Sequence, residues 1–214
     1  MSIYYSVHKG RNPGIYTSWL ECSAQVSGFS GAKYKKFPSF ELANEFFING
    51  TSKSPQQQLS SSNIITIYTD GSSCDYKGGY ACIFLYPDGR QEEKYGKIEG
   101  RCTNSRAELY AIMMAFMYSQ ILLENAPYPF TIRIFSDSDV SIKSLTEYLP
   151  KWKCSGWKKS SGEQISNIDL IQYLDQQMIE LQKKHTIEFI HVPSHSGIVM
   201  NERADLLAEQ GRLL

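Results

Sequence analysis

The chain has 214 residues, of which 42% are hydrophobic, and its 22 basic and 22 acidic side chains give a formal net charge of zero. That length suits one ordinary domain with a small second one, and no apolar run approaches the roughly 18 residues of a membrane span. A neutral chain excludes uniform electrostatic attraction to nucleic acid, so any such binding must depend on local clusters of charge.

The first predicted elements form a small α+β domain of ββαβα order over residues 1–49. In chain order, its strands and helices are predicted at residues 3–8, 15–17, 18–26, 32–37 and 40–48. The first helix is indicated by Ser18 and Glu21, which have the spacing of a capping box.

Aromatic and basic side chains recur in this small domain. They are Tyr5, Trp19, Tyr34, Lys35 and Lys36. Either the aromatic residues form a small core beneath a solvated lysine face, or the cluster is a surface that binds a nucleic-acid backbone. In a generic sequence the first interpretation is correct more often.

Residues 50–63 are polar and low in complexity, which predicts a flexible linker before a second domain at residues 64–214. This domain opens with a β-branched, apolar run that ends at Asp70. We expect a buried strand that stops at Asp70, where open α/β sheets place their functional sites. The chain is then predicted to turn at Gly78-Gly79.

An antiparallel hairpin and a long helix follow. The hairpin strands are predicted at residues 80–86 and 91–98, and the helix at residues 105–123. Glu108 falls on the edge of the apolar stripe of this helix. Because an inward carboxylate is costly unless something pairs with it, Glu108 is a candidate site residue.

A strand that leads to a carboxylate recurs at residues 131–135, which precede Asp137. The later segment at residues 151–159 holds four lysines and two tryptophans, Trp152 and Trp157. A charge run is usually a solvated face, but exposed tryptophans favour a binding surface.

The remaining predicted elements are helices at residues 139–148, 165–184 and 200–212 and a strand at residues 186–191. His195 lies in a loop of proline, serine and glycine, and Asp205 lies on the last helix. The element order of the second domain, βββα–βαα–βα, predicts an α/β fold with a mixed five-stranded sheet and flanking helices.

Four carboxylates stand out at strand ends and on helices: Asp70, Glu108, Asp137 and Asp205. Carboxylates gathered at one place repel one another unless a cation lies among them, and oxygen-only ligands suit Mg²⁺ or Mn²⁺. Two such ions can activate water and stabilise the leaving oxygen of a phosphodiester, and an imidazole such as His195 can move protons nearby. Taken singly, each carboxylate is more often a cap or a surface charge, and spacing alone leaves open whether the four meet.

Four groups of motifs carry a family resemblance: Asp70-Gly-Ser, Thr103-Asn-Ser-Arg-Ala-Glu108, Ser136-Asp-Ser138, and His191-Val-Pro-Ser-His195 with Asn201-Glu-Arg-Ala-Asp205. In order and spacing across residues 64–212 they resemble the signatures of ribonuclease H type 1. Residues 3–47 are similar to that family's N-terminal hybrid-binding domain, through Tyr4-Tyr5-Ser-Val, Thr17-Ser-Trp19-Leu-Glu-Cys22 and Lys33-Tyr34-Lys35-Lys36-Phe37.

The resemblance implies an endonuclease that cuts the RNA strand of RNA–DNA hybrids and leaves 5′-phosphate and 3′-hydroxyl ends. It implies two Mg²⁺ ions on the four carboxylates, for which Mn²⁺ can substitute, with His195 assisting turnover. The residues that it implies for nucleic-acid binding are Asn104 in the minor groove, Arg101, Thr103 and Asn167 at a phosphate of the DNA strand, Trp152 and Trp157 on the DNA strand, and Tyr5, Trp19, Tyr34, Lys35 and Lys36 in the hybrid-binding domain.

Two rival functions stay open at this point. A non-catalytic module that binds hybrids or duplex RNA is disfavoured because all four carboxylates are present. A transposase-like nuclease of the same fold is disfavoured by the His195 loop and the hybrid-binding domain. Duplex RNA remains an alternative ligand of the N-terminal domain, and we expect a monomer.

The five cysteines are scattered and form no C-x-x-C pair, which indicates reduced thiols and makes zinc an improbable ligand. The N-terminal residues show neither the apolar segment of a secretion signal nor the composition of a transit peptide. We therefore expect an intracellular protein, cytoplasmic or nuclear, with no membrane partner.

Overall fold

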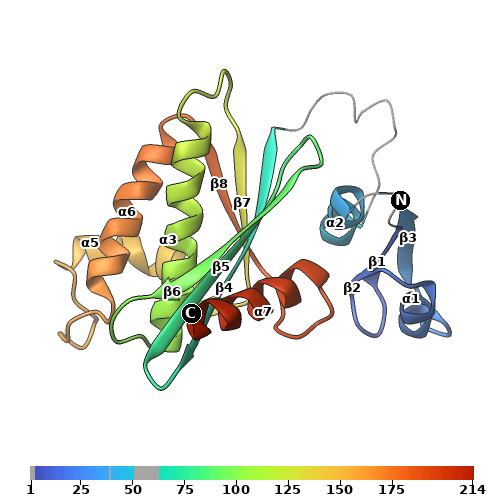
Figure 1. Ribbon diagram of the computed structural model, residues 1–214, viewed down its shortest axis with the longest axis horizontal. Coiled ribbons are helices and arrows are strands. Elements are labelled where there is room, and N and C mark those ends of the chain that lie inside the picture. Colours follow the sequence, from blue (N-terminus) through green and yellow to red (C-terminus); the bar gives the residue numbers. More distant parts are fainter. Residues whose placement is uncertain (1–2, 39, 51–62) are drawn as a thin grey trace. The chain divides into compact units, whose positions relative to one another are not determined.

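The computed structural model describes residues 3–38, 40–50 and 63–214, and these residues form two separate β-sheets (Figure 1). Most of the predicted linker, residues 51–62, lies outside the described residues. The linker therefore stays a prediction.

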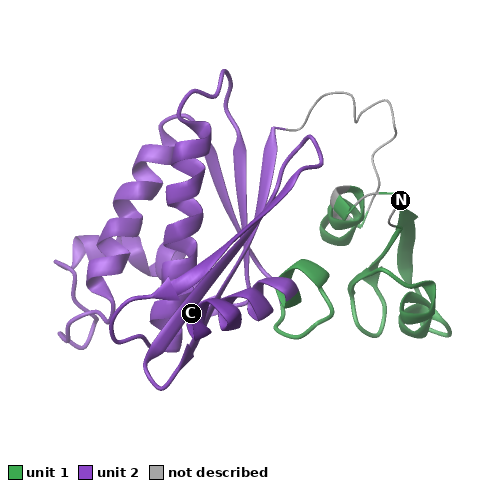
Figure 2. Cartoon of the chain, viewed as in Figure 1, with its two compact units in different colours: residues 1–62, 193–202 green, residues 63–192, 203–214 purple. Residues whose placement is uncertain are grey.

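The chain divides into two units (Figure 2). One comprises residues 1–62 with 193–202, and the other comprises residues 63–192 with 203–214. The segment 193–202 groups with the first unit, whereas the sequence suggests one uninterrupted second domain. The predicted domain boundaries stay predictions.

The first unit holds its elements in the predicted ββαβα order. They are β1 (Tyr4–Lys9), β2 (Gly14–Tyr16), α1 (Trp19–Val26), β3 (Lys33–Phe37) and α2 (Phe40–Asn49). The strands form an antiparallel sheet in the order β2-β1-β3. Ser18 is the N-cap of α1, because its Oγ accepts a hydrogen bond from the backbone N–H of Leu20 at 3.2 Å.

The two faces of this small sheet carry different helices, because side chains alternate along a strand. On one face Val7 packs against Cys22 and Val26 of α1. On the other face the ring of Phe37 lies 5.5 Å from that of Phe46 on α2. Each face thus buries a small apolar cluster of its own.

The second unit is built on the mixed five-stranded sheet that the sequence predicts. Its strands are β4 (Ile64–Cys74), β5 (Lys77–Leu85), β6 (Gln91–Ile98), β7 (Thr131–Ser136) and β8 (Thr186–His191). They lie in the order β6-β5-β4-β7-β8. The pairs β4–β7 and β7–β8 are parallel, and the other two pairs are antiparallel.

Helices flank this sheet, and Figure 1 shows α3 and α6 side by side. The helical segments are α3 (Asn104–Leu123), α4 (Asp139–Lys143), the π-helical turn η1 (Ser144–Tyr148), α5 (Leu149–Cys154), α6 (Ile168–Gln182) and α7 (Val199–Leu213). Apolar side chains of α3 and α6, including Ile112, Phe116 and Leu174, join Ile67 and Ile134 of the sheet in a fully buried core. This core fixes α3 against β4.

Two helices differ from their predicted bounds by three residues or more. The sequence pattern predicts one helix over residues 139–148, but the chain continues from α4 through η1 into α5. The pattern also starts the next helix at residue 165, but α6 begins three residues later. Asn167 has a φ of +57°, and this left-handed conformation cannot belong to a right-handed helix.

Strand β4 does not stop at Asp70, and the predicted turn at Gly78-Gly79 is wrong. The chain reverses at residues 75–76, and both glycines lie inside β5. A Cβ atom on Gly79 would lie 2.2 Å from the backbone oxygen of Ala208 on α7. Glycine here permits close packing of a helix on the strand.

All five cysteines carry free thiols; Cys74 and Cys154 are exposed and the other three are buried. Within the ranges that the structure describes, no helix combines the length and apolar composition needed to cross a membrane.

Candidate active site

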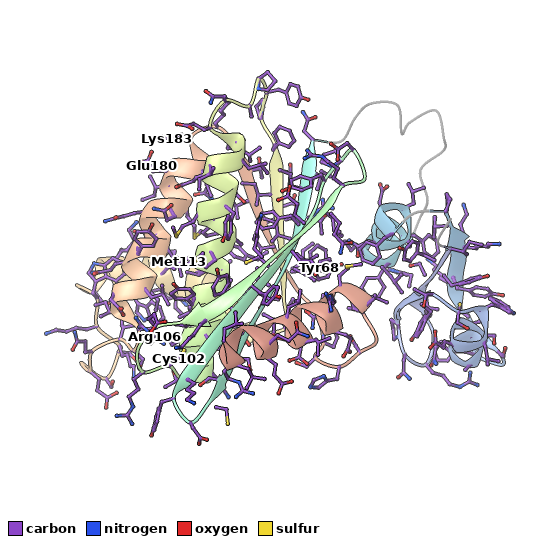
Figure 3. The ribbon with its side chains drawn as sticks, viewed as in Figure 1. Tyr68, Cys102, Arg106, Met113, Glu180 and Lys183 are labelled. Carbon is purple, nitrogen blue, oxygen red and sulfur yellow. The ribbon has the colours of Figure 1, made fainter. Side chains whose placement is uncertain are left out.

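Asp70 and Asp137 occupy equivalent places on two neighbouring parallel strands. The pairing of β4 with β7 ends at Tyr68 and Phe135, and each aspartate follows two residues later. The rings of Tyr68 and Phe135, the last pair of this register, stack with their centres 4.6 Å apart, and Figure 3 labels the Tyr68 side chain. The parallel register therefore brings both carboxylates to the point where the two strands separate.

Glu108 reaches this point from α3, because the helix passes very close to β4. A Cβ atom on Gly71 would lie 2.1 Å from the backbone carbon of Ala107, so only glycine allows this approach. The Oε2 atom of Glu108 is buried and has no hydrogen-bond partner within the described residues. The role of Gly71 in this packing could not be inferred from the sequence, although its position directly after Asp70 is a signal that could have suggested it.

The three carboxylates form one cluster. Asp70, Glu108 and Asp137 each offer an oxygen, and these oxygens all lie within 4.8 Å of one another. Burial first, and then the charges of Asp137 and Asp205, raise the pKa of Asp70 to about 7. Burial and the charges of Asp70 and Asp137 also raise the pKa of Glu108 well above its usual range. The charge of Asp205 on α7 thus also raises both pKa values, and its role as the fourth carboxylate of the site stays a prediction.

This arrangement fits a divalent cation. Three acidic side chains held this closely are unfavourable when ionised, unless a positive charge compensates them. All potential ligand atoms are carboxylate oxygens, which Mg²⁺ and Mn²⁺ prefer. Oε2 of Glu108 accepts no hydrogen bond from the described residues and is therefore available as a ligand.

Because Asp70 holds its proton more tightly in the folded protein, we expect the metal-free protein to lose stability as the pH rises. The pKa of an aspartate is ordinarily near 3.8, and that of Asp70 in the folded protein is about 7. The stabilisation is therefore complete below the lower value and is lost as the pH passes the higher one. Above pH 7, Asp70→Asn should raise the free energy of unfolding by on the order of a few kcal/mol.

Urea unfolding at pH 5.5 and 8.5 in a chelator measures this difference. Wild type should lose stability between these values relative to Asp70→Asn, and Mg²⁺ should restore it at pH 8.5 in wild type only. Asp88→Asn, which alters an exposed carboxylate bound by Arg90, is the matched control and should not reproduce the effect. Equal pH dependence in wild type and Asp70→Asn would contradict the raised pKa of Asp70, which burial and the neighbouring carboxylates cause.

His195 lies in a loop that belongs to the other unit, so its role at the carboxylates stays a prediction. Its side chain is 78% exposed, and its Nδ1 atom lies 3.9 Å from a carboxylate oxygen of Glu202. The same carboxylate accepts a hydrogen bond from the backbone N–H of Gly197 at 3.2 Å. Glu202, which lies within the Asn201–Asp205 motif, therefore stabilises the conformation of this loop.

Polar side chains surround the N-terminal end of α3. Thr103 caps the helix, with its Oγ1 accepting a hydrogen bond from the backbone N–H of Arg106 at 3.4 Å. The Arg106 side chain binds Asp169 through two hydrogen bonds and donates to Oδ1 of Asn167 at 3.4 Å. Figure 3 shows Arg106 and Cys102 at this end of α3. The sequence did not indicate Arg106 as a site residue, although it lies within the motif Thr103–Glu108.

The predicted phosphate-binding residues are partly brought together here. Thr103, Asn104 and Arg101 are exposed, and Arg106 connects this end of α3 to Asn167. The first backbone N–H groups of a helix have no partner within the helix, and the helix dipole adds positive potential. This end of α3 can therefore attract an anion.

The lysine-rich segment 151–159 is less exposed than its sequence suggests. Trp152 and Trp157 are partly buried and pack against the hydrophobic core. Lys153 and Lys159 form ion pairs with carboxylates, at 2.8 and 3.4 Å. The other two lysines of the segment have no carboxylate partner among the residues that the structure describes. The tryptophans therefore support the fold, and their role in DNA binding stays a prediction.

In the first unit, an aromatic row lies on one face of the sheet. The ring of Trp19 lies 5.5 Å from that of Tyr5 and 5.9 Å from that of Tyr34. Strand alternation puts Lys36 on this face, because it pairs with Tyr5. Lys35 falls on the opposite face, where its Nζ lies 5.7 Å from the centre of the Phe37 ring. Four of the five predicted residues thus share one surface.

Comparisons with known proteins match two parts of the chain. Residues 62–212 match the family model for RNase H, and residues 3–47 match the model for the ribonuclease H1 N-terminal domain. The ribonuclease H of Schizosaccharomyces pombe is 32% identical, and the match covers 97% of this chain and 96% of that protein.

Solved structures show the same fold. LC9-RNase H1, a type 1 RNase H with the type 2 active-site motif, is 25% identical with a TM-score of 0.57, over 70% of this chain and 72% of that one. LC11-RNase H1, solved in complex with an RNA/DNA hybrid, is 19% identical with a TM-score of 0.51, over 68% of this chain and 94% of that one. These likenesses confirm the predicted α/β fold of the second domain.

Proposed function

The chain belongs to the ribonuclease H family and is a ribonuclease H with the N-terminal domain of ribonuclease H1, and from that premise we propose that it hydrolyses the RNA strand of RNA–DNA hybrids by a two-metal-ion mechanism. The products would carry 5′-phosphate and 3′-hydroxyl ends. A hybrid is also the ligand in the complex of the structural relative LC11-RNase H1.

One observation carries this proposal: three carboxylates each offer an oxygen within 4.8 Å of the others. The Oε2 atom of Glu108 is also buried and has no hydrogen-bond partner among the described residues. Asp70, Glu108 and Asp137, joined by Asp205, would hold two Mg²⁺ ions, for which Mn²⁺ can substitute. When bound, the ions supply activation of water and stabilisation of the leaving oxygen. The carboxylates would hold the ions in fixed places, because the buried core fixes β4, β7 and α3.

The end of α3 would select and orient the hybrid. Asn104, the first residue of α3, would contact the minor groove, where the 2′-hydroxyl distinguishes RNA from DNA. Arg101, Thr103 and Asn167 would bind a phosphate of the DNA strand, with Arg106 holding Asn167 in place. A fixed contact on the DNA strand would direct the carboxylates to the RNA strand.

A gel assay with labelled RNA–DNA hybrid, duplex RNA and duplex DNA tests the proposed function. We expect cleavage of the RNA strand of the hybrid with Mg²⁺ and none in a chelator, with 5′-phosphate ends on the products. Binding of the hybrid without cleavage in any divalent ion would favour the alternative, a non-catalytic binding protein. Cleavage of duplex DNA at a comparable rate would contradict the assigned substrate.

His195→Ala should slow cleavage without removing it. General acid–base groups typically contribute about 10²–10⁴-fold. The imidazole is 78% exposed, so water or buffer can partly replace it, and we expect a loss of about 10²-fold or less. Single-turnover rates at saturating Mg²⁺ give the effect, and titration with Mg²⁺ provides the control. A lost response to Mg²⁺ in this variant would show that His195 holds the metal instead.

The first unit would bind the hybrid through the aromatic row of Tyr5, Trp19 and Tyr34 with Lys36. Stacking of aromatic rings on sugars or bases and contacts from lysine to phosphate are the ordinary means of such binding. Duplex RNA is a second candidate ligand of this surface, and the protein is proposed to act as a monomer. A duplex RNA that fails to compete for the hybrid, or a dimeric mass in light scattering, would contradict these two points.

A further inference from the structure

The turn between β4 and β5 contains a tyrosine in a conformation that tyrosine rarely adopts. Asp75 and Tyr76 have φ values of +51° and +63°, in the left-handed region that favours glycine or asparagine. The Tyr76 side chain is also 55% exposed, so burial does not explain it. A bulky residue kept in an unfavourable conformation points to a functional reason.

The Tyr76 ring supports an arginine. The guanidinium carbon of Arg101 lies 3.8 Å from the centre of the ring, which is close for a cation–π contact. Two hydrogen bonds fix the backbone beside it: the N–H of Cys102 donates to the oxygen of Tyr76 at 2.7 Å, and Oγ of Ser73 donates to the oxygen of Cys102 at 3.1 Å. The β4–β5 turn and the segment before α3 are therefore held together at Arg101.

Arg101 differs from the other arginines of the second unit. Arg90, Arg106, Arg133, Arg203 and Arg212 each form an ion pair with a carboxylate. Arg101 has no such partner among the described residues, and its guanidinium contacts the face of an aromatic ring. Stacking occupies the face of a guanidinium but leaves the N–H groups on its edge free for an anion.

We propose that Tyr76 is a positioning residue that holds Arg101 ready to bind a phosphate of the DNA strand. This inference rests on the proposed function and adds a residue to it. Arg101 lies two residues before the N-cap of α3, whose first N–H groups also attract an anion. A guanidinium already ordered by stacking loses less conformational freedom when it binds phosphate.

Tyr76→Asn is the sharpest variant, because asparagine accepts the left-handed conformation and keeps the turn while removing the ring. We expect a two- to fivefold rise in KM for the hybrid with little change in kcat, the size expected for an exposed cation–π contact. Tyr76→Phe keeps the ring and should match wild type.

Arg101→Ala should weaken binding about tenfold or more, as expected for a charged hydrogen bond. Arg90→Ala and Tyr128→Asn change an exposed arginine and tyrosine elsewhere and should have no effect.

The double variant separates positioning from direct contact. If Tyr76 acts through Arg101, Tyr76→Asn should have no effect in the Arg101→Ala background. An undiminished effect there would mean that the ring itself touches nucleic acid, which overturns the proposal. A melting temperature that falls in Tyr76→Asn together with kcat would indicate a structural role only, which also overturns it.

Hybrids with a single neutral methylphosphonate, moved stepwise along the DNA strand, identify the phosphate. Wild type should lose affinity at one position, and Arg101→Ala and Tyr76→Asn should be less sensitive at that same position. The same scan along the RNA strand should not distinguish the variants, and a difference there would contradict the assigned strand. If wild type did not cut hybrids at all, the proposed function would fail; if it cut and Tyr76→Asn behaved as wild type, only the inference on Tyr76 would fail.

Discussion

Asp70→Asn should abolish cleavage while leaving the fold and the affinity for hybrid intact. Asp70 lies on β4, which is paired on both sides, and its carboxylate is close to those of Glu108 and Asp137. Asparagine keeps the shape of the side chain while removing its charge. Stabilisation by bound metal is worth several kcal/mol, and every 1.36 kcal/mol is a factor of ten in rate. We therefore expect a loss of at least about 10³-fold in the single-turnover rate. Hybrid affinity depends on other residues and should change little.

The measurement combines cleavage in Mg²⁺ with binding by fluorescence anisotropy in a chelator. Asp88→Asn makes the same chemical change at an exposed turn and should cut as wild type does. Because Asp70→Asn should also be more stable than wild type in metal-free buffer, unfolding cannot explain its inactivity. Turnover at the wild-type rate would disprove the assigned site.

The order of elements and the four acidic positions could be predicted from sequence, because each leaves a local pattern. Hydrophobic alternation marks the strands, and motifs mark the acids. The place of Asp70 inside a longer strand could not be predicted. It depends on Gly71 and Gly79, which read locally as breaks but serve the close approach of α3 and α7. A glycine that permits packing and a glycine that makes a turn look alike in a single sequence.

The contacts between side chains that lie far apart in the sequence also could not be predicted from local patterns. Arg106 binds Asp169 and Asn167, which lie far along the chain, so its role appears only in the folded structure. Trp152 and Trp157 pack on a core that assembles from distant segments. The different faces of Lys35 and Lys36 could have been anticipated, because adjacent residues of a strand point in opposite directions.

Removal of residues 1–61 should weaken hybrid binding by at least about 10²-fold while leaving the chemistry in place. Residues 1–50 carry five basic and three acidic side chains, whereas residues 64–214 carry sixteen and nineteen, so the catalytic domain has little general attraction for nucleic acid. A second binding surface tethered to the first keeps the hybrid at high effective concentration. The fragment should begin at Ser62, because Asn63 binds the backbone of Thr131 and Pro129.

Trp19→Ala with Lys36→Ala in the full chain should reproduce much of this loss. Trp19 is central in the aromatic row and half exposed, and Lys36 shares its face. Lys35→Ala removes the same charge from the opposite face and is the matched control. Affinity measured against salt separates the two contributions, because lysine–phosphate contacts weaken with salt while stacking persists. The fragment should still cut hybrids, with fewer cuts per encounter. If the fragment bound the hybrid as tightly as the intact protein at moderate salt, residues 1–50 would not be a hybrid anchor.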